Sequence, residues 1–303
     1  MASEPNSRRN LTSFIALGEN HVGAGAFGLF AFLALTALAL SPDGGRLALG
    51  TTLGVYFYDA RSLAPQTFWP TADPVGRLLW SPRGDVLALI HRLDDQTQRL
   101  EVRAADTGAL LWSQTETPPA QCWTSGGVQY CYTRPGWRWK WAFSPDGGQI
   151  AIARGAQIDL RGSADGALLA SLGQGAAPAY YSLAWSAAGP LAACCADNQM
   201  QVWDPAAGQL LDRLRVQADL LALSPDGRLL SVDGVRVWDW RRRAELRGTA
   251  GGEMVTSVAF SPDGGRVVTG SGYGPVRVWA PAGAGLPQLL RGHSAAVVDV
   301  AWA

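Results

Sequence analysis

The stretch VTSVAFSPDGGRVVTGSGYGPVRVWA, residues 255–280, contains the pattern that decides the fold. Residues 255–260 alternate between apolar and small polar side chains, which is the period of two expected of a β-strand. Pro262-Asp263-Gly264 then favours a tight turn, because Pro presets φ, Asp bonds to nearby backbone groups and Gly accepts a positive φ. Three further strands are predicted at 266–270, 276–279 and 288–291. One unit is therefore four short antiparallel strands.

The same turn recurs along the chain. A hydrophobic residue followed by SPDG, or by the variants SPRG and SAAG, precedes the turn at Ser41, Ser81, Ser144, Ser186, Ser224 and Ser261. The successive spacings are 40, 63, 42, 38 and 37 residues, so a single interval is anomalous. Because four strands are too few to bury both faces of a sheet, the units must stack on one another. The sequence predicts an all-β propeller of four-stranded antiparallel blades over residues 34–303.

The third strand of the unit resembles the Trp-Asp ending of WD40 repeats. The likeness is carried by Val202-Trp203-Asp204 and Val237-Trp238-Asp239, by the weaker Tyr58-Asp59 and Trp279-Ala280, and by Arg291-Gly292-His293, which is similar to the Gly-His that opens such a repeat. Arg103 and Arg161 occupy the Trp position of two units. The resemblance covers residues 35 to 302 and implies a ring that holds other macromolecules. Since Gly-His occurs once, we expect apolar packing to replace the family's Asp-His-Ser-Trp hydrogen-bond network in most blades.

The chain ends on a lone copy of the first strand, at residues 296–302. WD40 rings usually close by pairing strands from the two ends of the chain in one blade, which removes an exposed sheet edge. We therefore expect seven blades, the last completed by the N-terminal segment 1–33 through residues 11–17 or 26–32. The alternative is a diverged seventh blade that stays incomplete.

Residues 22–40 carry no charge and allow two interpretations. The run approaches the length of a membrane-spanning helix. However, residues 36–40 occupy the first strand of the first unit, and three glycines interrupt the run. We expect a strand, with a membrane anchor as the alternative. The G-x-G-x-x-G pattern at 23–28 lacks the βαβ context that dinucleotide binding requires.

Composition and charge argue against several kinds of function. A formal net charge of zero, from 25 basic and 25 acidic residues, argues against binding nucleic acid. The three histidines, His21, His91 and His293, show no metal-binding spacing, and no G-x-S-x-G motif occurs. We expect no metal, no cofactor and no enzyme activity, with a propeller enzyme that uses a central-channel site as the alternative. Lys140 is the single lysine, which favours a GC-rich, bacterial genome.

The long interval between the second and third units predicts a β-hairpin over residues 121–132, within an insertion at about 115–136. Gly126-Gly127 suits a two-residue turn, and the pairing then places Trp123 opposite Tyr130 and Cys122 opposite Cys131. A disulfide between Cys122 and Cys131 is geometrically feasible and would imply an oxidising, extracytoplasmic compartment. Two reduced cysteines in a cytoplasmic protein are the alternative, and a cytoplasmic location is our expectation.

Aromatic and arginine side chains gather around this hairpin, and such residues anchor protein interfaces. The candidate partner-binding residues are Trp123, Tyr130, Tyr132, Arg134, Trp137 and Arg138. Packing of the insertion against the ring is the alternative. We expect a monomeric, non-catalytic scaffold that binds a protein partner. A membrane-anchored, extracytoplasmic propeller of an envelope assembly is the second interpretation.

One basic run, Arg241-Arg242-Arg243, follows the third strand of its unit. We interpret it as solvated turn charges paired with Asp239 or Glu245. An acidic partner or a phosphate site is the alternative.

Overall fold

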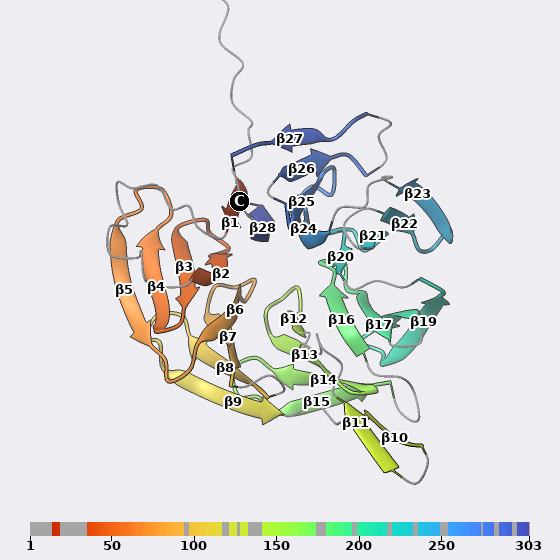
Figure 1. Ribbon diagram of the computed structural model, residues 1–303, viewed down its shortest axis with the longest axis horizontal. Helices are drawn as coiled ribbons and strands as arrows, with labels where there is room; N and C mark the ends of the chain where they lie inside the picture. Colours follow the sequence, from red (N-terminus) through yellow and green to blue (C-terminus); the bar gives the residue numbers. More distant parts are fainter. Residues whose placement is uncertain are drawn as a thin grey trace, which may run out of the picture.

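The computed structural model describes residues 14–18, 35–93, 97–116, 121–125, 128–132, 141–173, 180–195, 199–216, 220–232, 236–248, 254–273, 275–281, 285–292 and 296–302. These residues form six four-stranded antiparallel sheets arranged around a central axis, together with two two-stranded sheets (Figure 1). In each four-stranded sheet the strands follow one another in sequence order from the axis to the rim. We refer to these sheets as blades 1 to 6.

The bounds of the blades follow the repeats. Blade 1 consists of β2 (Leu35–Leu40), β3 (Arg46–Thr51), β4 (Gly54–Asp59) and β5 (Pro65–Pro70), and blade 2 of β6 (Val75–Trp80), β7 (Val86–Arg92), β8 (Gln98–Ala104) and β9 (Leu110–Glu116). Blade 3 consists of β12 (Trp141–Phe143), β13 (Gln149–Arg154), β14 (Gln157–Gly162) and β15 (Leu168–Leu172), and blade 4 of β16 (Tyr180–Trp185), β17 (Leu191–Cys195), β18 (Met200–Asp204) and β19 (Gln209–Leu214). Blade 5 consists of β20 (Leu221–Leu223), β21 (Leu229–Val232), β22 (Arg236–Asp239) and β23 (Ala244–Gly248), and blade 6 of β24 (Val255–Phe260), β25 (Val267–Ser271), β26 (Val276–Trp279) and β27 (Gln288–Leu290).

The Ser-Pro-Asp-Gly turn joins the innermost strand of a blade to the second one. In blade 1 the Ser41 hydroxyl donates to Asp43 Oδ1 at 2.5 Å and accepts from the backbone N–H of Arg46 at 2.8 Å. Gly44 has a φ of +67°, which a residue with a Cβ rarely adopts. The Ser–Asp hydrogen bond recurs in blades 3, 5 and 6. The hydrogen bond from Ser41 is the main reason that the pKa of Asp43 is lowered, so this carboxylate stabilises the turn.

The hydrophobic core lies in the seams between consecutive blades. Between blades 1 and 2, the Phe57 ring lies 4.3 Å from the Trp69 ring of its own blade and 6.1 Å from the Trp80 ring of blade 2, measured between centroids. Comparable buried clusters fill the next four seams. Because each sheet buries its faces against its neighbours, the stacking expected from the repeats is what stabilises the ring.

Buried ion pairs also stabilise blades 2 and 3, in addition to the apolar packing expected from the sequence. Arg103 Nη2 lies 2.8 Å from Glu101, and Arg161 Nη2 lies 3.6 Å from Asp159. Both acids are almost fully buried. Each arginine also donates to the carbonyl oxygen of the glycine in the following turn, at 3.3 and 2.8 Å. The arginine at the Trp position thus ties the third strand to its turn.

The two ends of the chain meet in a two-stranded sheet of β1 (Phe14–Gly18) and β28 (Val297–Trp302). The antiparallel register pairs Phe14 with Trp302 and Ile15 with Ala301, and β28 lies between the innermost strands of blades 6 and 1 (Figure 1). The expected pairing of the terminal strand with residues near 11–17 is therefore present. The prediction of seven blades is wrong, because the described residues form six. The physical reason is that, among the described strands, β1 and β28 alone come together at the closing position, and residues 26–32 lie outside the described part of the chain.

Candidate protein-interaction site

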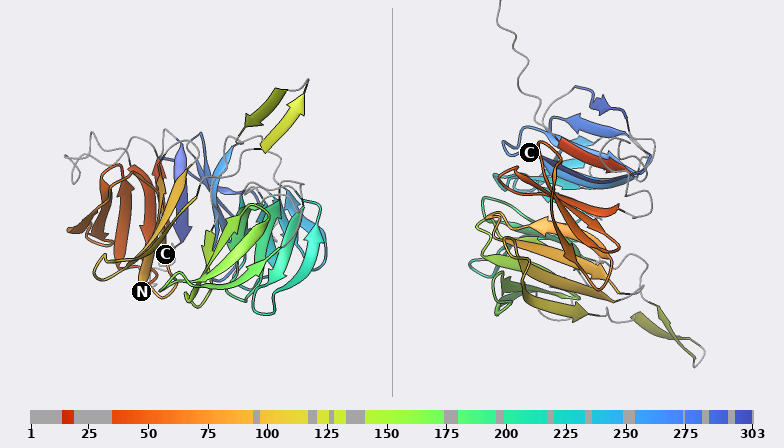
Figure 2. Two further views of the ribbon diagram at one scale, coloured as in Figure 1. Left: turned by 90° about the horizontal axis from the view of Figure 1, so that it is seen from below. Right: turned by 90° about the vertical axis from the view of Figure 1, so that its left-hand side faces the viewer.

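A hairpin of β10 (Gln121–Ser125) and β11 (Val128–Tyr132) stands outside the six blades. It interrupts the connection from β9 of blade 2 to β12 of blade 3 and projects from one face of the ring, beyond the rim (Figures 1 and 2). Among the described strands, β10 and β11 pair only with each other. We call the face that carries this hairpin the hairpin face.

The strand register of the hairpin is the one expected from the sequence. Ser125 pairs with Val128, Trp123 with Tyr130, and Cys122 with Cys131. Cys122 and Cys131 are therefore opposite each other in the ladder, and the disulfide stays a prediction. The side chains of Trp123, Tyr130 and Tyr132 are not among the described ones, and Arg134, Trp137 and Arg138 lie outside the described residues. Their partner-binding role likewise stays a prediction.

Exposed apolar side chains of the ring lie on the same face as the hairpin. Because the strands of a blade alternate in direction, the loops between second and third strands leave the ring on the side where one blade connects to the next. Tyr273, in such a loop of blade 6, is 72% exposed, and Met254, just before β24, is 61% exposed. The N–H of Gly272 donates to the carbonyl oxygen of Met254 at 2.8 Å, which holds the two loops together. Leu53 and Leu93 are exposed in the corresponding loops of blades 1 and 2.

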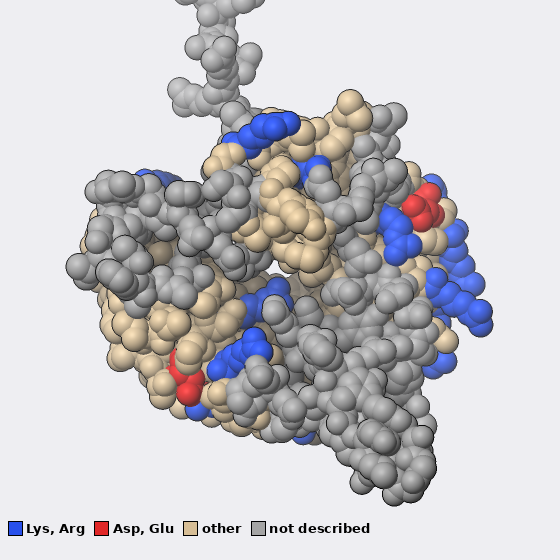
Figure 3. All heavy atoms as spheres, in the orientation of Figure 1, with Lys and Arg blue, Asp and Glu red and all other residues tan. Residues whose placement is uncertain are grey.

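These loop residues were not found from the sequence, because a single Leu, Met or Tyr in a loop has no pattern. The signal that was available is position. Each of these loop residues follows the second strand of a repeat or precedes the first strand. Because the turns fix the direction of each strand, this position also fixes the face of the ring on which the residue lies. Basic side chains also lie beside the central opening on this face (Figure 3). Arg77, on the innermost strand β6, is exposed.

A buried polar cluster supports the hairpin face in blade 2. His91, at the end of β7, is fully buried, and its Nδ1 lies 3.0 Å from the carbonyl oxygen of Asp73 in the loop before β6. Its Nε2 lies 3.4 Å from Glu101 Oε2, a mainly electrostatic contact at that distance. Arg99 spans the two acids, 2.6 Å from Asp73 and 3.0 Å from Glu101. The His91 ring, together with Arg103, lowers the pKa of Glu101 to about 2.

This cluster holds the loop before β6 against β7 and β8. Its acids and arginines form hydrogen-bonded ion pairs with one another. The cluster contains no Ser, Cys or Lys that the acids could activate as a nucleophile. Its arrangement therefore fixes the loop that carries Asp73 on the hairpin face. Sequence reasoning missed it because His91 and Asp73 come together only when β7 pairs with its neighbours.

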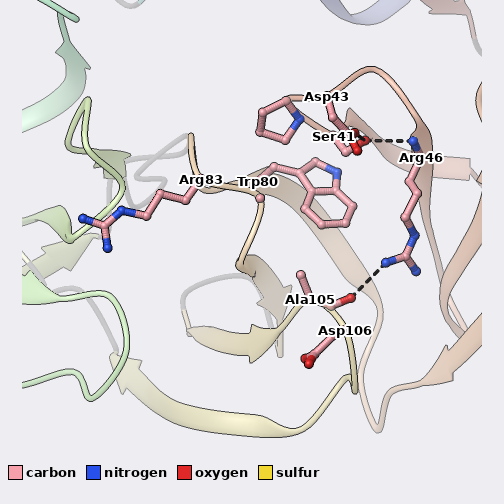
Figure 4. A pocket seen from close by; sticks show the side chains of 9 residues that line it. Ser41, Asp43, Arg46, Trp80, Arg83, Ala105 and Asp106 are labelled. Carbon is pink, nitrogen blue, oxygen red and sulfur yellow. Dashed lines mark hydrogen bonds between the residues drawn. The ribbon is translucent and has the colours of Figure 1, made fainter.

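The opposite face has a hollow of about 220 Å³ between blades 1 and 2 (Figure 4). Its walls come from the two Ser-Pro turns, with Trp80 beneath them. Arg46 donates to the carbonyl oxygen of Ala105 at 2.9 Å, and Arg83 points away toward Asp146 of blade 3 (Figure 4). The polar side chains thus bond to the blades themselves and do not converge on the hollow, so we do not assign a ligand to it.

Neither a metal-binding cluster nor a membrane-spanning helix occurs among the described residues. No group of three or more His, Cys, Asp or Glu in this part of the chain is placed to hold a metal ion. No helix in the same residues is long and apolar enough to cross a membrane. Cys194, in blade 4, is buried, and its thiol donates to the carbonyl oxygen of Val216 at 3.7 Å.

Comparison with known families agrees with the geometry. The family model described as WD domain, G-beta repeat matches residues 157–204 and 240–279. Each match ends at the third strand of a blade, at Asp204 and at Trp279, so the sequence repeat is offset from the blade and links consecutive blades. No curated protein matches the chain. The chain is a β-propeller in which WD40 repeats are detected over these two ranges, and WD40 propellers are commonly scaffolds for protein interaction.

Proposed function

We propose that this protein is a non-catalytic scaffold that binds a protein partner through the hairpin face. The observation that carries the proposal is the hairpin β10–β11, which pairs with no blade and projects from the face on which Tyr273 and Met254 are exposed. Exposed aromatic residues and methionine in a group are typical of protein-binding surfaces.

The chemistry of this face favours a protein over a nucleic acid. Nucleic-acid binding depends on phosphate contacts by a continuous basic surface, whereas the chain has no net charge. The exposed residues Leu53, Leu93, Met254 and Tyr273 are uncharged, and burying them stabilises a complex through apolar area. Arg77 adds a guanidinium at the innermost strand of the same ring. We therefore propose a partner that presents an apolar surface.

The test is affinity capture from a lysate of the native host. The intact protein is compared with three variants: residues 120–133 replaced by a short Gly-Ser turn, the double substitution Met254→Ala and Tyr273→Ala, and the control Leu286→Ala. Leu286 is 95% exposed but lies between β26 and β27, on the opposite face. We expect one partner to be captured by the wild type and by the control, and to be lost from the other two. Equal capture by all four proteins would refute the proposal.

Location is a separate proposal. We propose a cytoplasmic protein with Cys122 and Cys131 as thiols. The observation that favours the extracytoplasmic alternative is their position opposite each other in the hairpin ladder. Thiol titration of the denatured protein, prepared from its native host with and without reductant, distinguishes the two. A reductant-dependent gain of two thiols would overturn the cytoplasmic proposal.

A further inference from the structure

The outer strands of the six blades are edges that another strand could pair with, and four of them are protected. Protection comes from Pro65 and Pro70 in β5, from charged residues in β19 and β23, and from the shortness of β27, which follows Pro287. The remaining two edges are β9, LLWSQTE, and β15, LLASL. β15 has neither proline nor charge, and the single charge of β9 is its last residue. A bulge occurs against the third strand in blades 1 to 5, so it does not distinguish these two edges.

The same two edges expose a leucine that is covered at the equivalent position of blade 4. In blade 4, Leu210 pairs with Trp203 and packs against the cluster that contains it. At the equivalent positions, Leu110 pairs with Arg103 and Leu168 pairs with Arg161. Because each arginine turns toward its acid and its turn carbonyl, it leaves the leucine uncovered. Leu110 and Leu168 are 53% and 54% exposed.

The exposed leucines of β9 and those of β15 are close together on the rim. The Trp112 indole of β9 donates to the carbonyl oxygen of Ser163 at 2.9 Å, in the turn that leads to β15. A Cβ at Gly166 of this turn would be 2.7 Å from the Trp112 ring. The leucines at the start of β9 and of β15 therefore flank one packed seam. Leu169, next to Leu168, is 55% exposed, so β15 is apolar on both of its sides.

In place of the monomer expected from the sequence, we propose that the outer edge of β15 pairs with the same edge of a second copy of this chain. Among the described strands β15 is the last of its sheet, so backbone N–H and C=O groups along its outer side have no strand partner. An antiparallel pair of identical strands is self-complementary about a two-fold axis, which is the symmetry of most homodimers. The formal net charge of zero means that two copies do not repel each other at long range. The leucines at the start of β9 extend the apolar contact on each side.

The test is sedimentation velocity of the full chain over a range of concentrations, with single substitutions on the rim. Leu168→Lys and Leu169→Lys place a charge on the proposed edge, twice per dimer. The control Leu211→Lys lies on β19, which already carries Asp212 and Arg213, and Leu211 is 46% exposed. We expect a concentration-dependent dimer for wild type and control. Each β15 variant should raise the dissociation constant by about 100-fold, the factor for losing one leucine contact from each side of a two-fold interface.

Several outcomes would overturn this proposal. A wild type that is monomeric at all concentrations would do so, and so would a dimer that persists in both β15 variants or dissociates equally in the Leu211→Lys control. Because all three leucines are exposed, the circular dichroism spectrum and the unfolding midpoint should be unchanged, and they report whether each variant folds. Replacing residues 120–133 by the Gly-Ser turn should leave the dimer intact. The dimer and the partner-binding hairpin face are therefore tested separately.

Discussion

Replacing Glu101 by glutamine removes the charge at the centre of the polar cluster in blade 2. Glu101 is buried and lies within 3.4 Å of three groups that can carry a positive charge, on His91, Arg99 and Arg103. The His91 ring and the Arg103 guanidinium lower its pKa from 4.5 to about 2, which corresponds to about 3 kcal/mol of folding free energy at neutral pH. We expect Glu101→Gln to lower the free energy of unfolding at pH 7 by about this amount, a large fraction of the ~5–15 kcal/mol of a typical domain.

The stabilisation that Glu101 provides should weaken as the pH falls. A carboxyl whose pKa is depressed in the folded state stabilises the fold above its unfolded pKa, and that contribution is lost as the pH falls toward the folded pKa. The difference between wild type and Glu101→Gln should therefore be constant above pH 5, shrink below pH 4.5 and be almost gone near pH 2. Asp73 faces the same cluster and remains in both proteins.

The assay is urea unfolding followed by tryptophan fluorescence at a series of pH values. The matched control is Glu245→Gln, an exposed glutamate on β23, which should change the free energy of unfolding by less than about 0.5 kcal/mol. The reasoning is refuted if Glu101→Gln unfolds at the same urea concentration as wild type at pH 7. A loss that does not shrink on acidification would equally show that the charge of Glu101 is not its cause.

Three further predictions concern the turns. Gly166→Ala, at a φ of +69° and against the Trp112 ring, should cost about 3 kcal/mol in urea unfolding, and a loss below about 1 kcal/mol would contradict the seam geometry. Arg243 occupies the equivalent turn position of blade 5, and Arg243→Gly relieves its φ of +53° but removes the ion pair to Asp212. Because the two effects oppose each other, the urea midpoint should stay close to that of wild type. A large drop would mean that the ion pair dominates. Ser261→Ala removes the turn hydrogen bonds to Asp263 and Arg266 and should lower the free energy of unfolding by about 1–2 kcal/mol, whereas an unchanged midpoint would show that the serine is dispensable.

The local rules of the repeat predicted much of the fold. The Ser-Pro-Asp-Gly turn and the alternating strand before it depend on residues next to each other in sequence, so blades 1 to 6 follow the serine spacing. The register of the hairpin was predictable for the same reason, because a two-residue Gly126-Gly127 turn leaves one way to pair the flanking residues. The pairing of β28 with residues near 11–17 was one of the two pairings expected for this strand.

The number of blades was not predictable in this way. Residues 1–33 contain no Ser-Pro-Asp-Gly turn and no third-strand motif, so the number of strands that join β28 depends on tertiary contacts and not on a repeat. In the part of the chain that the structure describes, six blades and a two-stranded closure are the result.

The sequence contains a pattern from which the buried ion pairs of blades 2 and 3 could have been predicted. Glu101-Val102-Arg103 and Asp159-Leu160-Arg161 have the same acid-apolar-arginine spacing at the same place in consecutive units. On a strand, residues two apart share a face, so an acid and an arginine so placed can pair. The basic run Arg241-Arg242-Arg243 behaves as expected in part: Arg242 lies 3.6 Å from Asp239, but Arg243 pairs with Asp212 of blade 4, 2.5 Å away. That contact needs the neighbouring blade and has no sequence pattern.

Site-specific photo-crosslinking in cells of the native host tests the central claim most directly. A photoreactive phenylalanine replaces Tyr273 on the hairpin face or Leu286 on the opposite face, both of which are highly exposed. The account predicts a crosslink from position 273 to one protein partner, and no such crosslink from position 286. Crosslinks to the same protein from both positions, or from position 286 alone, would contradict the claim that the hairpin face is the binding surface.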